Sequence, residues 1–308
     1  MNVEEKIPLV IVAGPTASGK TALAIEIAKK TGGEVISADS MQIYRDMTIG
    51  TAKPTAEEMQ GVVHHLIDIA SPDENFSLGK YADLAHKAIK DVYSRGKLPI
   101  LCGGTGLYID TVADNIELAD VPADPNLRKN LTRRAEEEGA ESLYRELQKI
   151  DPASAAKLHI NDTKRVIRAL EIYYLTGETK TRGDEKSKKQ KKIYNYLYFT
   201  IETERKILYN RINMRVDKMI DEGLFEEGRN LFEKYGFLDT TAMQGIAYRE
   251  MRMYYRGFLS YNETVNLIKR NSRRLAKRQI TWFGKRDDLI KVSADDIEKC
   301  VNLIEKML

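Results

Sequence analysis

The feature that most constrains the fold of this chain is a glycine-rich segment near its beginning, residues 14–21 with the sequence GPTASGKT. The apolar run 7–13 precedes it, and an alanine-rich stretch from about Thr21 to Lys30 follows it. The run is too short for a buried helix and indicates a strand, whereas the stretch after the glycines indicates a helix. A strand, a glycine-rich loop of this spacing and a helix together make a phosphate-binding loop, or P-loop. The segment therefore predicts a site for a di- or triphosphate at the end of a buried strand.

The residue types of this loop suit the chemistry of a phosphate chain. Glycine allows the backbone to wrap around an anion, so that successive N–H groups converge on its oxygens beside a helix N-terminus. Lys20 adds a positive charge, and the Thr21 hydroxyl can bind a Mg²⁺ ion that bridges phosphate oxygens. We therefore expect Mg²⁺ as the cofactor, held by Thr21. We also expect phosphate contacts from the whole loop, namely Gly14, Pro15, Thr16, Ala17, Ser18, Gly19, Lys20 and Thr21.

The spacing of apolar runs predicts an α/β fold for most of the chain. Runs 34–38 and 98–102 indicate two further strands, and a helix near 78–95 separates them. Alternation of this kind is typical of a parallel sheet with crossover helices. Runs 194–201 and 289–292 indicate strands that rejoin the same sheet. The expected fold is a P-loop NTPase-like parallel sheet flanked by helices.

After about Asn115 the pattern becomes helical. Helix N-caps are expected at Asp124, Asp151 and Asp162, and helix ends at Gly139 and Gly177. Residues 186–192 hold five lysines in seven positions and are too polar to pack, so we expect a mobile linker there. The chain is thus predicted to have two domains, an α/β core of residues 1–115 and 193–308 and an all-helical insert of residues 116–192.

Composition narrows the class of protein. Residues 1–115 carry 11 basic and 15 acidic side chains, a balance of −4, whereas residues 116–308 carry 38 and 31, a balance of +7. A polyanionic partner would therefore bind the second part. The two cysteines, Cys102 and Cys300, have no metal-site spacing and are expected to pack in the interior. With no leader and no apolar run of ~18 residues, we expect a cytoplasmic protein without a membrane segment.

Two loops are expected to face the P-loop, because ligands of open parallel sheets bind beyond the carboxyl ends of the strands. These loops are residues 39–42 and 103–106. Asp39 suits either a Mg²⁺ partner or a general base that takes a proton from a substrate amine. Thr105 presents one hydroxyl among three glycines and suits a hydrogen bond to a diphosphate oxygen. From the P-loop alone, a nucleotide-dependent kinase is the default interpretation.

An ordered set of motifs makes the chain similar, nearly end to end, to the bacterial tRNA dimethylallyltransferases, also called tRNA isopentenyltransferases. The P-loop is shared widely, but the whole set is specific. It comprises GPTASGKT (14–21), ISADSMQIY (36–44), GTAK (50–53), HHLID (64–68), GGTGLY (103–108), RVIRALE (165–171) and AKRQITWF (276–283). Two positions depart from the family pattern. Val63 stands where proline is usual, and Ala247 replaces a common glycine in QGIAYR (244–249).

The resemblance implies a transfer reaction on tRNA. The P-loop would bind the diphosphate of dimethylallyl diphosphate, and Asp39 would be the general base toward the exocyclic amine of an adenosine beside the anticodon. Thr105 would steady the diphosphate near the reacting carbon, and Arg215 would face the same diphosphate. The resemblance further implies that Asp39, Ser40, Met41 and Gln42 touch the target nucleotide and that Arg128 lies near tRNA.

A basic stretch favours an RNA partner. Residues 264–286 carry eight basic side chains and no acidic one. Arg270, Arg274 and Arg278 recur at i, i+4 and so share one face of a helix, a pattern that suits a phosphate backbone. The predicted tRNA contacts are Asp39, Ser40, Met41, Gln42, Arg128, Arg165, Arg168, Arg274 and Arg278. We expect the anticodon arm of tRNA as the partner and a monomeric enzyme without a protein partner.

Three other interpretations stay open at the level of sequence. The first is an isopentenyltransferase that acts on free adenine nucleotide, which would need neither the helical insert nor the basic stretch. The second is a P-loop small-molecule kinase that uses ATP. The third is a non-catalytic RNA-binding protein with a vestigial P-loop, against which the intact Lys20, Thr21, Asp39 and Thr105 argue.

Overall fold

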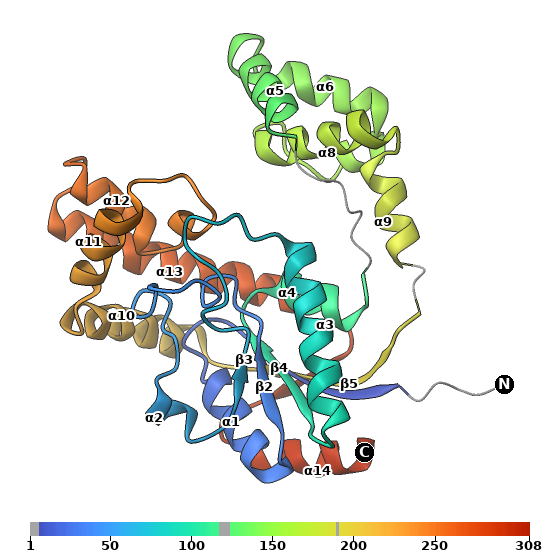
Figure 1. Cartoon of the computed structure of the whole chain (residues 1–308), viewed down its shortest axis with the longest axis vertical. Coiled ribbons are helices and arrows are strands. Elements are labelled where there is room, and N and C mark those ends of the chain that lie inside the picture. The colour runs from blue at the N-terminus through green and yellow to red at the C-terminus, as the bar shows by residue number, and fades with distance from the viewer. Residues whose placement is uncertain (1–5, 117–123, 189–190) are drawn as a thin grey trace. The chain divides into compact units, whose positions relative to one another are not determined.

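The computed structural model describes residues 6–116, 124–188 and 191–308, and within them six parallel strands form one sheet (Figure 1). The strand order is β3-β2-β4-β1-β5-β6, with β1 (Ile7–Ala13) in the interior. On either side of β1 lie β4 (Pro99–Gly103) and β5 (Tyr194–Ile201). The remaining strands are β2 (Glu34–Ser37), β3 (His64–His65) and β6 (Leu289–Val292). The predicted α/β fold with a P-loop NTPase-like parallel sheet is confirmed.

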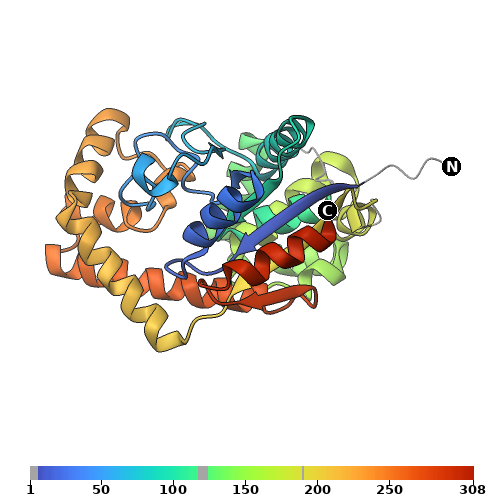
Figure 2. The same ribbon diagram turned by 90° about the horizontal axis from the view of Figure 1, so that it is seen from below.

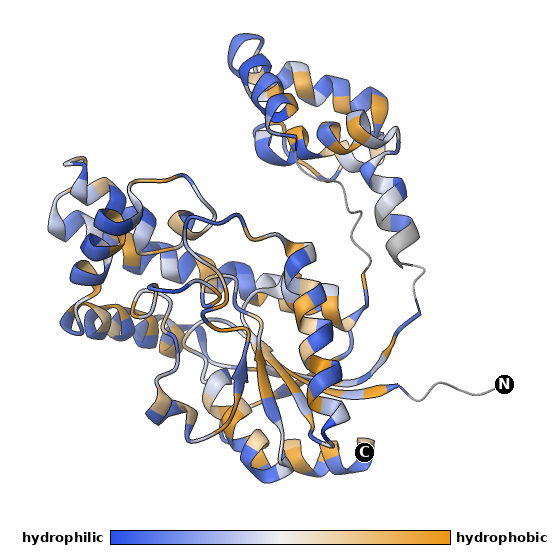
Figure 3. Cartoon of the chain, viewed as in Figure 1, coloured by the Kyte–Doolittle hydropathy of each residue, from blue (hydrophilic) through white to orange (hydrophobic). Residues whose placement is uncertain are grey.

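The side chains of β1 alternate between two apolar cores, one on each face of the sheet. Leu9 and Ile11 belong to the core that includes α3 (Leu78–Ser94) and α4 (Gly106–Ala113). Val10 and Val12 belong to the core that includes α1 (Lys20–Thr31) and α14 (Ile297–Met307). Figure 3 shows hydrophobic residues concentrated on the strands. Such a pattern is typical of parallel strands that are buried on both faces.

The helices between β5 and β6 lie beyond the carboxyl ends of the strands (Figure 2). They are α10 (Arg205–Asp221), α11 (Leu224–Tyr235), α12 (Tyr248–Tyr255) and α13 (Tyr261–Phe283), with a short 3-10 turn at Ala242–Gln244. Helix α13 contacts α10, α12 and α4. It begins with a capping box, in which Ser260 and Glu263 each accept the backbone N–H of the other. The last turns of α13 lie next to the loops that follow β1 and β4.

The chain divides into two compact units, Met1–Ala113 with Lys192–Leu308, and Asp114–Lys191. The second unit contains α5 (Pro125–Glu137), α6 (Ala140–Ile150), α7 (Pro152–Ala155), α8 (Thr163–Thr176) and α9 (Lys180–Lys188). These helices have an apolar core of their own, which includes Leu131, Leu143, Leu147, Val166 and Leu170. The first unit also holds the short helix α2 (Ala56–Met59).

Helix starts in the second unit follow the sequence prediction at all three positions, and the side chain caps the helix at two of them. The carboxylates of Asp124 and Asp151 accept backbone N–H groups at the starts of α5 and α7. Asp162 precedes α8, but its side chain makes no capping hydrogen bond. Its carboxylate lies 3.1 Å from Arg165 Nη1 instead, so an ion pair replaces the predicted cap.

The lysine-rich segment is partly helical, which corrects the expectation of a mobile linker. Residues 186–188 complete α9. Lysine has a favourable intrinsic helix propensity, so a helix can continue into this part of the segment. Residues 189 and 190 lie outside the described part of the chain. Within that part, no helix combines the length and the apolar character needed to cross a bilayer.

Candidate active site

The P-loop joins β1 to α1 and leaves the first turn of that helix open to a ligand. Gly19 has φ 95°, a left-handed conformation that favours glycine, and no side chain caps α1. The first backbone N–H groups of a helix have no partner within the helix. These free donors and the positive end of the helix dipole together favour an anion at this point.

Two cationic side chains, Lys20 and Arg215 of α10, line one cavity at this helix end. Lys20 Nζ donates to the Pro15 carbonyl at 3.4 Å, and within the described chain neither cation has an acidic partner in an ion pair. The pKa of Lys20 lies below its usual value, mainly because its ammonium group is buried. The nearby charge of Arg215 lowers this pKa further, whereas Cys102 and Asp39 partly offset the effect. Burial of its guanidinium also lowers the pKa of Arg215, although the side chain keeps exposed surface. As whole residues, Lys20 is partly buried and Arg215 is exposed. Two neighbouring cations without an acidic partner make a favourable site for an anion.

Asp39 follows β2 and Thr105 follows β4, and hydrogen bonds hold their two loops together. Thr105 Oγ1 accepts from Ser40 N at 3.0 Å, and Thr105 N donates to Ala38 O at 3.1 Å. Asp39 Oδ1 accepts from Met41 N at 2.9 Å, and the residue lines the cavity. Thr105 is not among the described residues that line it. The structure therefore places Asp39 at the cavity and Thr105 in contact with the loop that carries it.

The cavity has a volume of about 660 Å³, enough for a small ligand with its leaving group. Six of the predicted diphosphate contacts line it, namely Thr16, Ala17, Gly19, Lys20, Thr21 and Arg215. Of the predicted nucleotide contacts, Asp39 and Gln42 line it as well. Ile25, Ile49 and Met219 add apolar surface to its wall. The carboxylates of Asp39, Glu58 and Glu222 also line it. The site thus combines cations, carboxylates and apolar side chains.

The Gln42 amide joins the strand β2 to one wall of the cavity, the loop of residues 48–55. Its Nε2 donates to the carbonyls of Thr51 and Ala52 at 3.3 and 3.1 Å. Its Oε1 accepts from the Ser37 hydroxyl at 3.3 Å. Gln42 therefore has a structural role here, and its predicted contact with the nucleotide stays a prediction.

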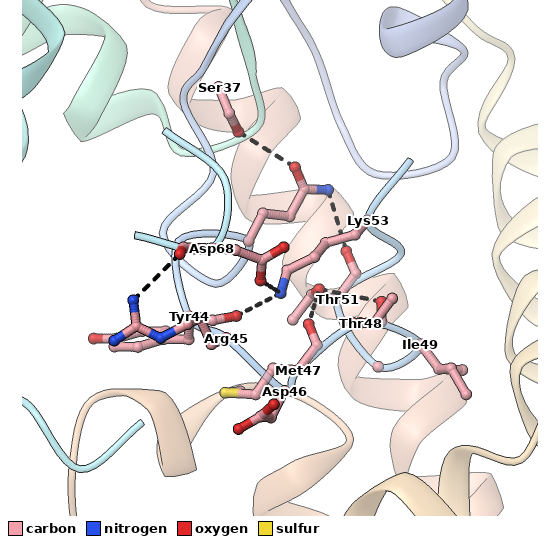
Figure 4. Close-up of polar contacts among 12 residues, drawn as sticks. Ser37, Tyr44, Arg45, Asp46, Met47, Thr48, Ile49, Thr51, Lys53 and Asp68 are labelled. Atoms are coloured by element: carbon pink, nitrogen blue, oxygen red, sulfur yellow. Dashed lines mark hydrogen bonds and ion pairs between the residues drawn. The ribbon is translucent and has the colours of Figure 1, made fainter. Parts of the chain in front are cut away.

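Two residues that the sequence analysis missed fix the same wall. Buried Lys53 donates to the Tyr44 carbonyl and to the Asp68 carboxylate (Figure 4). Glu227 of α11 accepts the backbone N–H groups of residues 48, 49 and 50 at 2.8, 2.7 and 3.0 Å. Lys53 lies in the GTAK motif, which was a usable signal. No sequence signal connects Glu227 to that loop, because the partners lie at least 177 residues apart.

The predicted basic stripe lies on the surface of α13. Arg270, Arg274 and Arg278 are exposed, and among the described residues none of the three side chains has a hydrogen-bond or ion-pair partner. Two other basic residues of this helix bind α10, Arg273 through Asn213 and Lys269 through Asp217. The exposed arginines are therefore available for phosphate groups.

Arg128, Arg165 and Arg168 of the insert pair with acidic residues of their own unit. Arg128 Nη2 and Arg168 Nη1 donate to Glu171 Oε2 at 2.7 and 2.6 Å, and Glu171 is fully buried. Burial raises the pKa of Glu171, but the hydrogen bonds from the two arginines outweigh it and leave that pKa below its usual value. Arg165 is exposed and pairs with Asp162. Contact of these three arginines with tRNA stays a prediction.

Mg²⁺ fits this cavity in the company of a phosphate ligand. Thr21 and Asp39 line the same space, and the residues that the structure describes include no group of three His, Cys, Asp or Glu side chains that could hold a metal ion. Mg²⁺ commonly takes one or two protein oxygens and completes its shell with water and substrate phosphates. The Thr21 hydroxyl is compatible with that arrangement.

The paired histidines have structural partners. His65 Nε2 lies 2.7 Å from Glu34 Oε2, and His64 Nδ1 lies 2.9 Å from the Val62 carbonyl. Glu34 also binds Arg95 in a bidentate pair with both distances at 2.7 Å. Cys102 and Cys300 are free and buried. None of these side chains calls for a metal.

Comparison with known proteins gives a consistent result. The family model described as IPP transferase matches residues 42–287. The tRNA dimethylallyltransferases of Acetivibrio thermocellus and Halalkalibacterium halodurans are each 46% identical, covering 97% and 95% of this chain and 96% and 93% of their own.

Solved structures agree with the relatives. The full-length tRNA isopentenylpyrophosphate transferase from Bacillus halodurans superimposes with a TM-score of 0.73 at 44% identity, covering 98% of this chain and 97% of that one. A eukaryotic dimethylallyltransferase, solved while acting on tRNA, gives a TM-score of 0.78 at 30% identity and covers 96% of this chain and 75% of its own.

Proposed function

The chain belongs to the IPP transferase family, and on that premise we propose that it transfers the dimethylallyl group of dimethylallyl diphosphate to the N6 amine of a tRNA adenosine. The acceptor is the adenosine immediately 3′ of the anticodon, and diphosphate is released. The observation that carries the proposal is one cavity that joins two unpaired cations, an open helix N-terminus and the Asp39 carboxylate.

Stabilisation of the leaving diphosphate is the main contribution of the protein. Backbone N–H groups of the P-loop, Lys20 and Arg215 face the place where negative charge develops as the carbon–oxygen bond breaks. Preorganised donors of this kind are worth roughly 10²- to 10³-fold each in turnover. A bound Mg²⁺, held by Thr21, would neutralise further phosphate charge. Thr105 remains a proposed diphosphate contact.

Asp39 acts on the nucleophile. The N6 nitrogen forms a bond to the allylic carbon, the bond from that carbon to the diphosphate oxygen breaks, and a proton passes from N6 to the Asp39 carboxylate. Such general-base help contributes roughly 10² to 10⁴ in rate. The hydrogen bond from Met41 N to Asp39 Oδ1 holds the carboxylate in place for this step.

The RNA must bring its adenine into the cavity. A stacked base has to be extruded, at a cost of a few kcal/mol. Exposed Arg274 and Arg278 would bind phosphates outside the cavity, and the insert arginines Arg128, Arg165 and Arg168 would contact the anticodon arm. The proposed enzyme works as a monomer, and its tRNA substrate makes the cytoplasm its expected place of action.

Labelled dimethylallyl diphosphate tests the proposal directly. The protein is incubated with it, Mg²⁺ and either tRNA or AMP, and the label is followed. We expect label in tRNA and none in AMP. Transfer to AMP would favour a free-nucleotide prenyltransferase, and ATP consumption without prenyl transfer would favour a kinase. Binding of tRNA without either reaction would favour a non-catalytic RNA-binding protein.

The variant Asp39→Ala tests whether Asp39 acts as the general base or only contributes to substrate binding. We expect turnover to fall by roughly 10² to 10⁴, because no group then accepts the N6 proton. The dissociation constant for tRNA should change little, as measured by filter binding. Equal losses in rate and in tRNA affinity would refute the base assignment.

A further inference from the structure

Gln279 belongs to the AKRQITWF motif and has no role in the chemistry described above. It lies on α13, and its side chain reaches both loops that carry the site. Its Oε1 accepts the backbone N–H of Thr16 in the P-loop at 2.9 Å. Its Nε2 donates to the Gly104 carbonyl, in the loop after β4, at 2.9 Å. One amide thus joins two loops, and each lies more than 170 residues from Gln279 along the chain.

The backbone of Gly104 lies close against the Gln279 amide. A Cβ atom at Gly104 would lie 2.5 Å from Gln279 Nε2, closer than side chains approach. A side chain at position 104 would therefore displace the Gln279 amide. Position 279 needs a donor and an acceptor at once, in that orientation, which only an amide supplies among side chains of this length.

The contact continues to the proposed base. Gly104 directly precedes Thr105, whose hydroxyl accepts Ser40 N at 3.0 Å. Ser40 directly follows Asp39. Three hydrogen bonds therefore connect the P-loop to the base. They join Thr16 to Gln279, Gln279 to Gly104, and Thr105 to Ser40, and the residues between them are neighbours in sequence.

We propose that Gln279 is a positioning residue that sets the distance between the leaving diphosphate and the base. This inference rests on the proposed function. The allylic carbon must lie between a phosphate oxygen held by one loop and an amine whose proton is taken at the other. A displacement of about 1 Å from such an arrangement can cost roughly 10²-fold in rate. Gln279 keeps the two loops in register without touching either substrate.

The other neighbour of Gln279 on α13 supplies a matched control. Ile280 follows Gln279 in sequence, and its side chain is exposed. Adjacent residues of a helix point in different directions, so the two side chains have different surroundings. Ile280→Ala therefore serves as the control, since it lies next in sequence and has no part in the proposed chemistry or in the predicted tRNA contacts.

Single-turnover kinetics on Gln279→Met test the inference. Methionine keeps the length and volume of the side chain but removes both hydrogen bonds. With tRNA and dimethylallyl diphosphate both saturating, we expect the rate of the chemical step to fall about 10- to 100-fold. The dissociation constants for both substrates and the melting temperature should stay near those of the wild type. Ile280→Ala should leave the rate of the chemical step and both dissociation constants near those of the wild type.

Gly104→Ala disrupts the hydrogen bond between Gln279 and Gly104 from the other partner. The added methyl group displaces the amide, so the variant should show the same loss of rate, and it serves in place of Gln279→Met if that variant is unstable. The double variant should be no slower than the slower single variant, because both changes remove one connection. Wild-type rates in both single variants, fully additive losses, or a loss confined to tRNA affinity would overturn the inference. A wild-type protein that fails to prenylate tRNA would instead overturn the proposed function.

Discussion

Ala247 has a backbone conformation of φ 78° and ψ −56° immediately before α12, a region that side chains with a Cβ atom rarely occupy. The structure thus gives a physical reason for the glycine that is common in this family at that position. Ala247→Gly should raise the free energy of unfolding by about 1 kcal/mol, since relief of the strain exceeds the added entropy of the unfolded chain. In thermal unfolding this corresponds to a rise of roughly 2–3 °C.

Ala242 supplies the control for that measurement. It is also a buried alanine near α12, at 0% exposure, but its φ is not positive. Ala242→Gly loses a buried methyl group and relieves nothing, so it should destabilise the fold by about 1 kcal/mol. If both glycine substitutions lowered the melting temperature equally, the strain at Ala247 would be refuted.

At the scale of elements, α11 holds the wall of the cavity through a single carboxylate. Glu227 accepts three successive backbone N–H groups and the Tyr248 hydroxyl. Glu227→Gln removes acceptor capacity and places an N–H₂ group against backbone donors. We expect the KM for dimethylallyl diphosphate to rise about tenfold, because residues 48–50 shift in the cavity wall. Glu226→Gln, at an exposed neighbour that pairs with Arg229, should leave this KM unchanged. A similar rise in KM for both variants would show that Glu227 does not act by holding residues 48–50.

The exposed face of α13 predicts a salt-dependent affinity. Each arginine that contacts a phosphate contributes about one unit to the slope of log affinity against log salt. Arg274→Gln together with Arg278→Gln should therefore flatten this slope by about two units in tRNA binding assays. Lys306→Gln on α14, a helix that packs on the α1 face of the sheet, should not change it. A slope that does not respond to the two arginines would remove the stripe from the RNA surface.

Periodicity and spacing predicted the P-loop and five of the six strands that the structure describes, because those signals are local. The two-residue strand β3 is too short to give such a signal and was not predicted. The strands β1, β5 and β6 begin and end where their apolar runs do. Side-chain partners distant in sequence were beyond such reasoning. Gln42 was expected at the nucleotide, and only the folded chain brings the carbonyls of Thr51 and Ala52 to its amide. For the same reason the pairing of Arg128 with Glu171, 43 residues away, could not be predicted from local patterns.

The division of the molecule into two units leads to the last prediction. Every described residue that lines the cavity lies in the unit Met1–Ala113 with Lys192–Leu308, and that unit has its own apolar cores. Asn115 Nδ2 donates to the Lys191 carbonyl at 3.1 Å, so the chain leaves for the insert and returns from it at neighbouring points. Replacement of residues 116–190 by about four glycine and serine residues can therefore close the gap.

This shortened chain should keep the diphosphate site and lose the RNA reaction. We expect cooperative unfolding and an affinity for dimethylallyl diphosphate within about threefold of the full chain, measured by calorimetry, because no cavity residue has been removed. Transfer to tRNA should fall at least ~10²-fold, since a substrate bound through fewer contacts is held less often in the reactive position. Full transfer activity in the shortened chain would show that the insert does not bind tRNA, whereas loss of dimethylallyl diphosphate binding would show that the core depends on the insert for its site.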